Sequence, residues 1–278
     1  TCGWMMWNWL VSGLASGAAV VIYDGSPGHP DLGTLWRMAE RTGITHFGTS
    51  PKFLAACSKS ELVPKNVANL SNFKSLLSTG SPLVPEQFDW VYENVHSDIQ
   101  VASISGGTDI IGCFLAGSPI LPVHRGELQC AQLGMDVQSW DIEGKPVFGQ
   151  SGELVCTRPF PSMPIGFWND EDGSRYQEAY FDDFDGVWTH GDYVEMTANG
   201  GAIIYGRSDT TLNPGGVRIG TAEIYRAVEN MAPIVDAIVV GRPNEGDVDV
   251  VLCVKLTTGT DFDKKLESDI RGLIKSAT

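Results

Sequence analysis

The chain has 278 residues, of which 42% are hydrophobic and 19% charged, and its formal net charge is −15. This composition is ordinary for a globular protein and allows a large buried core in one large or two smaller domains. The negative charge disfavours nucleic-acid binding and membrane association, and an anionic substrate would need a local positive field from Arg, backbone N–H groups or a metal.

The six cysteines are dispersed and form no C-x-x-C pair: Cys2, Cys57, Cys113, Cys130, Cys156 and Cys253. The five histidines are equally scattered. The spacing therefore predicts free thiols in a reducing compartment and disfavours a zinc site or a histidine-built metal site.

The first residues are apolar, and we expect a buried helix from about Trp4 to Ala15 and then a buried strand over Ala18–Tyr23. A membrane-spanning helix needs about 20 apolar residues, and here Asn8, Ser12 and several glycines interrupt the run. No basic residue flanks the segment, so a signal peptide also fits badly.

Strands and helices alternate over the first hundred residues. The predicted helices are Asp31–Arg41, Pro51–Cys57 and Pro85–Val95, and the predicted strands are Thr45–Phe47, Ser75–Ser78 and Ile99–Ile104. This order is typical of an α/β fold with a mostly parallel sheet and helices on its faces.

From about Ile110 the pattern predicts short strands rich in Gly and Pro turns. These strands are Glu127–Gln132, Asp136–Trp140, Glu153–Thr157, Tyr193–Met196 and Ala202–Tyr205. The last two are joined by Asn199-Gly200-Gly201, a strong hairpin signal.

The pattern changes again near Ser208. It predicts helices over Thr221–Asn230 and from Asp263 to the end, with strands over Val235–Val240 and Val248–Leu256 between them. We therefore expect a large domain over residues 1–208, α/β over 1–109 and β-rich over 110–208, and a small α+β domain beginning at 209 and still incomplete at 278.

Two glycine-bearing segments directly follow predicted strands: Leu77–Pro82 and Ser103–Asp109. Ligands of open parallel sheets bind at the carboxyl ends of strands. Thr108 and Asp109 supply a hydroxyl and a carboxylate suited to phosphate and Mg²⁺. Taken alone, each segment is more simply explained as an ordinary tight turn.

Two later segments carry further candidates. In the segment Trp188–Asp192, the carboxylate of Asp192 is suited to accept hydrogen bonds from the hydroxyls of a ribose, and in Tyr205–Asp209 the guanidinium of Arg207 is suited to donate to the same ligand. Taken alone, Asp192 is more simply explained as a turn residue and Arg207 as a surface cation. The glycine loop of Leu212–Glu223 leads into a helix, and a capping loop with an exposed Arg218 remains the alternative.

Together, the order and spacing of these segments resemble the ANL superfamily of acyl-CoA synthetases, peptide-synthetase adenylation domains and luciferases. Within it, the chain resembles the acetoacetyl-CoA synthetases over essentially its whole length. The motifs that carry this resemblance are CGWMMWNW at 2–9, YDGSP at 23–27, SISGGTDII at 103–111, FWNDE at 167–171, HGDY at 190–193 and LNPGGVR at 212–218.

The resemblance implies a role for each matching residue. Gly80, Ser81 and Pro82 would border adenine, Thr108 would face the phosphates, and Asp192 and Arg207 would bind ribose. Asp109 stands where most of the superfamily has a Mg²⁺-binding Glu, so its shorter side chain could act through water. Similarly, His190 replaces the Thr that usually precedes the Gly-Asp pair.

The resemblance also assigns Trp4, Met5, Thr79 and Gly106 to the acid substrate, Gly216 and Arg218 to coenzyme A, and Asp209 to the hinge. Arg218 would also lie near the α-phosphate, so Thr108, Asp109 and Arg218 are the expected catalytic residues. In acetyl-CoA synthetases a Trp stands at the place of Gly106 and closes the pocket around two carbons.

The implied activity is cytosolic, ATP- and Mg²⁺-dependent ligation of acetoacetate to coenzyme A through an acyl-adenylate. The superfamily's phosphate loop and catalytic Lys are expected before residue 1 and after Thr278, so the chain alone should be inactive. A non-catalytic module that binds nucleotide or a partner, and a synthetase for acetate or propionate, are the alternatives. We expect neither nucleic-acid binding nor membrane insertion.

Overall fold

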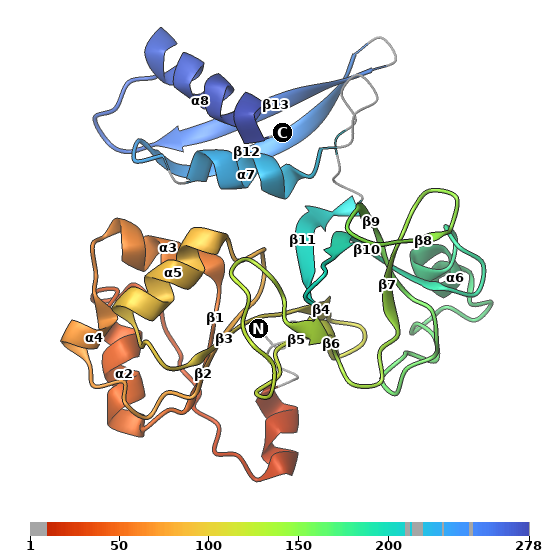
Figure 1. The fold of residues 1–278 in the computed structure, drawn as a ribbon, viewed down its shortest axis with the longest axis horizontal. Helices are drawn as coiled ribbons and strands as arrows, with labels where there is room; N and C mark the ends of the chain where they lie inside the picture. The colour runs from red at the N-terminus through yellow and green to blue at the C-terminus, as the bar shows by residue number, and fades with distance from the viewer. Residues whose placement is uncertain (1–9, 209–211, 213–218, 230, 245–246, 278) are drawn as a thin grey trace. The chain divides into compact units, whose positions relative to one another are not determined.

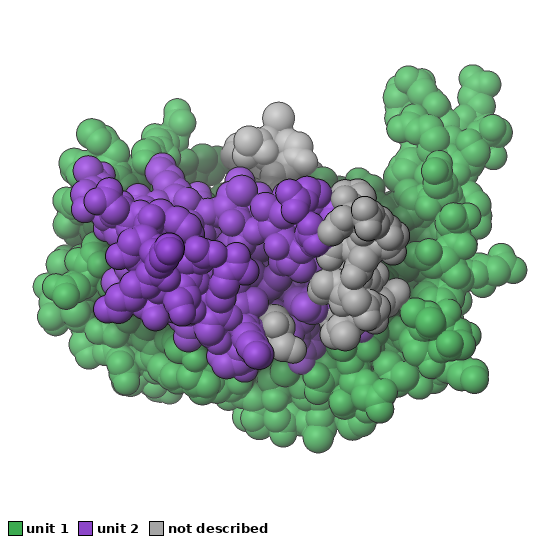
Figure 2. Space-filling model, turned by 90° about the horizontal axis from the view of Figure 1, so that it is seen from above, with its two compact units in different colours: residues 1–190, 195–203 green, residues 191–194, 204–278 purple. Residues whose placement is uncertain are grey.

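A computed structural model describes residues 10–208, 212, 219–229, 231–244 and 247–277. The chain divides into two units, one made of residues 1–190 and 195–203 and the other of residues 191–194 and 204–278 (Figure 2). Helices and strands are mixed, with one parallel sheet and several antiparallel sheets, as the α/β pattern predicts.

The first unit contains a parallel sheet of three strands in the order β1-β2-β3. These strands are β1 (His46–Thr49), β2 (Ser75–Ser78) and β3 (Gln100–Ser103). His46 pairs with Ser75 and Ser75 with Gln100, so the three strands start and end in register. The predicted parallel sheet is confirmed, and its carboxyl ends form one edge.

Four helices lie beside this sheet (Figure 1): α2 (Thr34–Thr42), α3 (Pro51–Lys59), α4 (Pro64–Val67) and α5 (Pro85–Asn94). Helix α3 begins where Ser50 Oγ accepts the Phe53 N–H at 3.3 Å and Pro51 occupies the first turn, the residue types that favour a helix start. Trp36, Phe47, Phe53 and Phe73 pack together between helices and strands, with ring centroids 5.0–6.4 Å apart.

The predicted strand over Ala18–Tyr23 is wrong. Helical backbone at residues 10–13 leads into the short helix η1 (Leu14–Ser16), but residues 18–23 are not a strand, and Ile22 is 63% exposed. An apolar, β-branched run forms a strand only when a neighbour pairs with it, and no described strand does so. The amino-terminal part of the predicted helix, which includes Trp4, lies outside the described residues.

The segment predicted to be rich in strands forms two sheets. One is antiparallel, with β4 (Ser105–Gly107), β5 (Gly112–Ala116) and β6 (Cys130–Ala131). The other has the order β11-β10-β9-β7-β8 and contains β7 (Val137–Trp140), β8 (Pro146–Val147), β9 (Ser151–Cys156), β10 (Trp188–Met196) and β11 (Ala202–Arg207). A short helix, α6 (Ser174–Tyr180), was not predicted.

Most predicted strands differ from the structure by a few residues at their ends, and two differ more. Strand β10 begins at Trp188 rather than Tyr193, and only Cys130–Ala131 of the predicted Glu127–Gln132 is a named strand. The hairpin at Asn199-Gly200-Gly201 is confirmed: Gly200 has a φ of +81°, and the Thr197 N–H donates to the Gly201 carbonyl at 3.0 Å. Gly permits this positive φ without steric cost.

The carboxyl-terminal elements are α7 (Thr221–Glu229), β12 (Ile234–Asn244), β13 (Asp247–Leu256) and α8 (Lys264–Ala277). The two strands form an antiparallel hairpin, and both helices contribute to the apolar core beside it (Figure 1). Asp263 Oδ1 accepts the Leu266 N–H at 2.8 Å and so caps α8, as helix-start residues do. The predicted α+β pattern of this segment is confirmed.

Candidate functional site

The carboxyl ends of β1, β2 and β3 are tied together by backbone hydrogen bonds. The Thr79 N–H donates to the Thr49 carbonyl at 3.2 Å, and the Ile104 N–H donates to the Ser78 carbonyl at 2.9 Å. The segments after β2 and β3 therefore leave the sheet at the same edge, the edge at which parallel sheets bind ligands.

The predicted adenine loop follows β2. Thr79 is buried, Gly80 and Ser81 are exposed, and Pro82 is half-buried. Gly80 has a φ of +96°, and nothing lies within 4 Å of the position that a Cβ would take. The loop thus presents open backbone next to the strand ends, a geometry that permits close approach of a flat ligand.

The predicted loop over Ser103–Asp109 is partly a strand, which corrects the sequence interpretation. Ser105–Gly107 forms β4 and pairs with β5, with Gly106 opposite Cys113 and Gly107 opposite Gly112. Short glycine-rich segments carry no alternation from which a strand could be predicted. A Cβ on Gly106 would lie 2.0 Å from the Gly112 carbonyl oxygen, so the strand pairing itself requires glycine there.

Thr108 and Asp109 lie in the exposed turn between β4 and β5, where the Ile111 N–H donates to the Thr108 carbonyl at 3.1 Å. The structure thus places the two predicted phosphate and metal residues next to each other at a solvent-facing tip. The Tyr180 hydroxyl, from the end of α6, donates a hydrogen bond to Asp109 Oδ2.

These two residues are a reasonable fit to Mg²⁺. Among the described residues no group of three or more His, Cys, Asp or Glu side chains gathers as a metal site. Mg²⁺ is usually held by one or two carboxylates together with substrate phosphates and water. One exposed carboxylate beside a hydroxyl therefore suits a Mg²⁺ ion that arrives with a nucleotide better than a permanently bound metal.

His190 packs beneath this turn. Its Nε2 is 3.2 Å from the Gly106 carbonyl oxygen, its ring lies 4.6 Å from that of Phe114, and a Cβ on Gly107 would come within 2.8 Å of the ring. His190 is buried. The histidine that replaces the superfamily's Thr therefore supports β4 from below.

The predicted ribose binders are brought together in the second unit. Arg207 Nη1 lies 3.5 Å from Asp192 Oδ1, and the Asp192 side chain is 11% exposed against 49% for Arg207. Gly191 has a φ of +79°, and a Cβ there would lie 2.4 Å from Arg207 Nη2. The arginine thus lies directly over the backbone at Gly191, and the carboxylate and guanidinium lie side by side.

The remaining predicted site residues cannot be placed. Trp4 and Met5 of the acid pocket, the hinge Asp209, and Gly216 and Arg218 of the coenzyme A site lie outside the described residues. Thr79 and Gly106 are the acid-pocket candidates within the described chain.

Sequence reasoning missed Tyr180 and α6. The helix has seven residues and is largely polar, so it carries no long apolar repeat. The available signal was aromatic: Tyr176 and Tyr180 are spaced i, i+4 and therefore share one helix face, and Phe181 and Trp188 follow closely.

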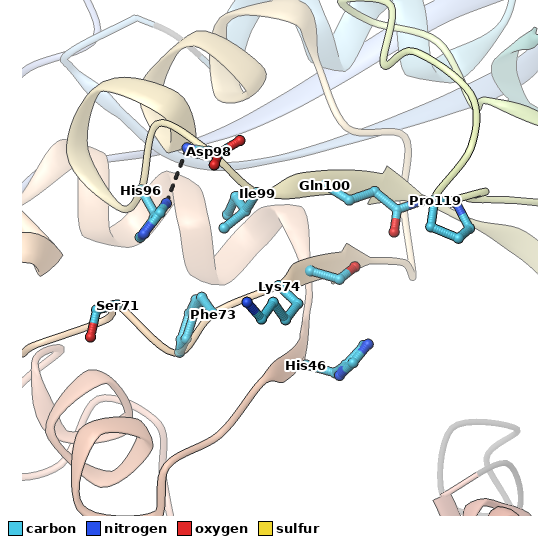
Figure 3. Close-up of a pocket in the computed structure, with 10 residues that line it drawn as sticks. His46, Ser71, Phe73, Lys74, His96, Asp98, Ile99, Gln100 and Pro119 are labelled. Atoms are coloured by element: carbon cyan, nitrogen blue, oxygen red, sulfur yellow. Dashed lines mark hydrogen bonds between the residues drawn. The ribbon is translucent and has the colours of Figure 1, made fainter.

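A separate cavity of about 410 Å³ lies at the opposite edge of the parallel sheet. His46, Ser75 and Gln100, which begin β1, β2 and β3, line it together with residues of the neighbouring loops (Figure 3). There His96 Nδ1 accepts the Asp98 N–H at 3.0 Å. The cavity contains none of the predicted nucleotide-binding residues, so it is distinct from the candidate site.

Known proteins resemble this chain in sequence and in fold. The sequence profile of the family described as AMP-binding enzyme matches residues 2–165. Acetoacetyl-coenzyme A synthetase of Rhizobium meliloti (strain 1021) is 54% identical over 276 residues, which are 99% of this chain and 42% of that protein. Acetoacetyl-CoA synthetase of Danio rerio is 49% identical over 279 residues, again 42% of its length. The chain therefore spans less than half of these relatives.

Solved structures are similar as well. Acetoacetyl-CoA synthetase from Streptomyces lividans superposes with a TM-score of 0.90 at 48% identity, covering 98% of this chain and 42% of that one. The anthranilate CoA ligase AuaEII, in complex with anthranoyl-AMP, superposes with a TM-score of 0.75 at 19% identity, covering 94% of this chain and 48% of that one. The second match speaks to the fold alone.

Proposed function

Because the chain belongs to the AMP-binding enzyme family, we propose that the protein containing it is an acid–thiol ligase that joins acetoacetate to coenzyme A. Acetoacetate would attack the α-phosphate of ATP, giving acetoacetyl-AMP and pyrophosphate. The thiol of coenzyme A would then displace AMP. The observation that carries the proposal is 54% identity to an acetoacetyl-coenzyme A synthetase over 99% of this chain.

The described residues have roles in the first half-reaction. Gly80, Ser81 and Pro82 would border the adenine, and Asp192 with Arg207 would bind the ribose hydroxyls. Thr108 would donate to a phosphate oxygen. Mg²⁺, held by Asp109 together with the nucleotide, would neutralise phosphate charge. These roles fit a mechanism in which positioning and preorganised electrostatics supply most of the rate.

The second half-reaction would use the small domain. We assign residues 1–208 to the large domain, with 1–109 as its α/β part and 110–208 as its β-rich part, and residues 209–278 to the start of a mobile domain that turns about Asp209. Gly216 and Arg218 would face coenzyme A, and Trp4, Met5, Thr79 and Gly106 would surround the acid. Domain rotation between half-reactions would admit the thiol only after the adenylate has formed.

We place the protein in the cytosol, where ATP and coenzyme A are available. No helix in the described part of the chain has the length and apolar character to span a membrane. We also propose that the partners are small molecules alone, with the −15 charge disfavouring nucleic acid.

The test is ATP–pyrophosphate exchange by the full-length protein with acetoacetate, acetate or propionate as the acid. We expect exchange that depends on acetoacetate and is slower with acetate or propionate. Nucleotide binding without exchange for any acid would favour the non-catalytic alternative, and faster exchange with acetate or propionate would reassign the substrate.

A further inference from the structure

Tyr180 makes a long-range contact with the proposed metal residue. It is the last residue of α6, and its hydroxyl donates to Asp109 Oδ2 across 71 residues of sequence. Asp109 Oδ1 accepts no hydrogen bond from any described residue. One carboxylate oxygen is thus held by the phenol, while the other has no donor within the described chain.

The tyrosine ring is itself fixed by packing. It stacks on Trp188 with the ring centroids 3.7 Å apart and the planes inclined by 16°. Trp188 is 1% exposed and is surrounded edge-on by Phe160, Phe181 and Tyr176. Tyr180 itself is half-buried. Because aromatic pairs are stabilised by both area and geometry, the stack on Trp188 presents the phenol hydroxyl from a rigid platform.

The helix that carries Tyr180 is also anchored. The carboxylate of Asp170 accepts the N–H groups of Arg175 at 3.1 Å and Tyr176 at 2.9 Å, and the Tyr176 hydroxyl donates to the Pro164 carbonyl at 2.6 Å. The position of Tyr180 is therefore set by contacts that do not involve the β4–β5 turn.

Asp109 needs such support more than a longer residue would. It lies in an exposed turn, where an unsupported side chain exchanges between rotamers, and it is one methylene shorter than Glu. A donor that holds one oxygen orients the other, which is how outer hydrogen bonds orient metal-binding carboxylates.

We propose that Tyr180 is a positioning residue that orients the Asp109 carboxylate toward the Mg²⁺ of a bound Mg–ATP complex. The inference rests on the proposed function for the identity of the ligand. Tyr180 should therefore affect the binding of ATP together with Mg²⁺. It should not affect the contacts that the protein makes with the base and ribose of the nucleotide.

The test uses the full-length protein and binding without turnover. Calorimetry measures the Kd for ATP, with no acid or coenzyme A present, at saturating Mg²⁺ and in excess EDTA. Tyr180→Phe keeps the ring stacked on Trp188 but removes the hydroxyl. We expect it to raise the Kd for Mg–ATP about three- to tenfold, the range expected for one hydrogen bond, and to leave the Kd for metal-free ATP unchanged.

Tyr176→Phe is the matched control because it removes a phenol hydroxyl from the same aromatic group without touching Asp109, while the two Asp170 contacts and the Trp188 stack still hold Tyr180 in place. It should leave both Kd values unchanged. Asp109→Ala completes a double-mutant cycle, in which Tyr180→Phe should have no further effect on Mg–ATP binding if it acts through Asp109.

Equal Mg–ATP affinity in wild type and Tyr180→Phe would overturn the proposal, as would an equal loss in Tyr176→Phe or additive losses in the cycle. Acetoacetate-dependent exchange by the same wild-type preparation tests the proposed function separately. Binding of Mg–ATP without exchange would reject the ligase assignment while leaving the cycle decisive, and a wild-type protein that binds no ATP would overturn both.

Discussion

Replacement of Gly106 by alanine separates two explanations for this glycine. By resemblance, Gly106 leaves room for a four-carbon acid where acetyl-CoA synthetases have a Trp. The structure supplies a second reason: a Cβ would lie 2.0 Å from the Gly112 carbonyl oxygen and 2.6 Å from the Cys113 Cα. Gly106→Ala should therefore destabilise the protein even though a methyl group scarcely narrows a pocket.

The expected cost follows from the size and nature of this overlap. Real Cβ atoms essentially never come within 3.0 Å of another heavy atom, so the paired strand must move by about 1 Å. The obstructing atoms belong to backbone and cannot rotate away. Overpacking typically costs about 1–3 kcal/mol, and we expect Gly106→Ala to lie near the upper end, at about 3 kcal/mol.

The assay is urea unfolding followed by tryptophan fluorescence, with two controls. In Gly107→Ala the new Cβ would lie 2.8 Å from the His190 side chain. A side chain can move more easily than backbone, so Gly107→Ala should lower the free energy of unfolding by less than Gly106→Ala. Gly272→Ala, in α8 with nothing within 4 Å, should instead stabilise by about 0.5–1 kcal/mol. The backbone explanation would be refuted if Gly106→Ala were as stable as wild type and had a lower kcat/KM for acetoacetate relative to acetate. That result would favour a role of Gly106 in shaping the acid pocket.

Two further predictions concern binding and thiol chemistry. Asp192→Ala should weaken ATP binding by about 1–3 kcal/mol, because the ribose hydroxyls lose a charged acceptor; an unchanged calorimetric Kd would reject the ribose assignment. Burial raises the pKa of the Cys113 thiol to about 11, so this thiol stays protonated and poorly reactive at pH 8, whereas Cys253 is exposed. Mass spectrometry after brief iodoacetamide treatment at pH 8 should find Cys253 modified before Cys113, and comparable rates at the two sites would contradict the burial argument.

The sequence by itself determined the elements whose signals are local. Strand β2 has the predicted bounds, Ser75–Ser78, and the hairpin at Asn199-Gly200-Gly201 is where the turn residues place it. The parallel direction of the first three strands followed from their alternation with helices, because a parallel pair needs a crossover between its strands. The motifs that resemble those of adenylate-forming enzymes could also be recognised from the sequence, because each consists of a few consecutive residues.

The tertiary structure decided what depends on distant neighbours. Residues 18–23 have the composition of a buried strand, but they form none, and no strand among the described residues pairs with them. Strand β4 exists because β5 pairs with it, and only that pairing shows why residue 106 lacks a side chain. The contact between Tyr180 and Asp109 joins residues 71 positions apart, and the sequence around either residue does not indicate the other as its partner. Periodicity and turn chemistry report on a few consecutive residues, whereas packing and hydrogen bonding between distant segments are set only when the whole chain has folded.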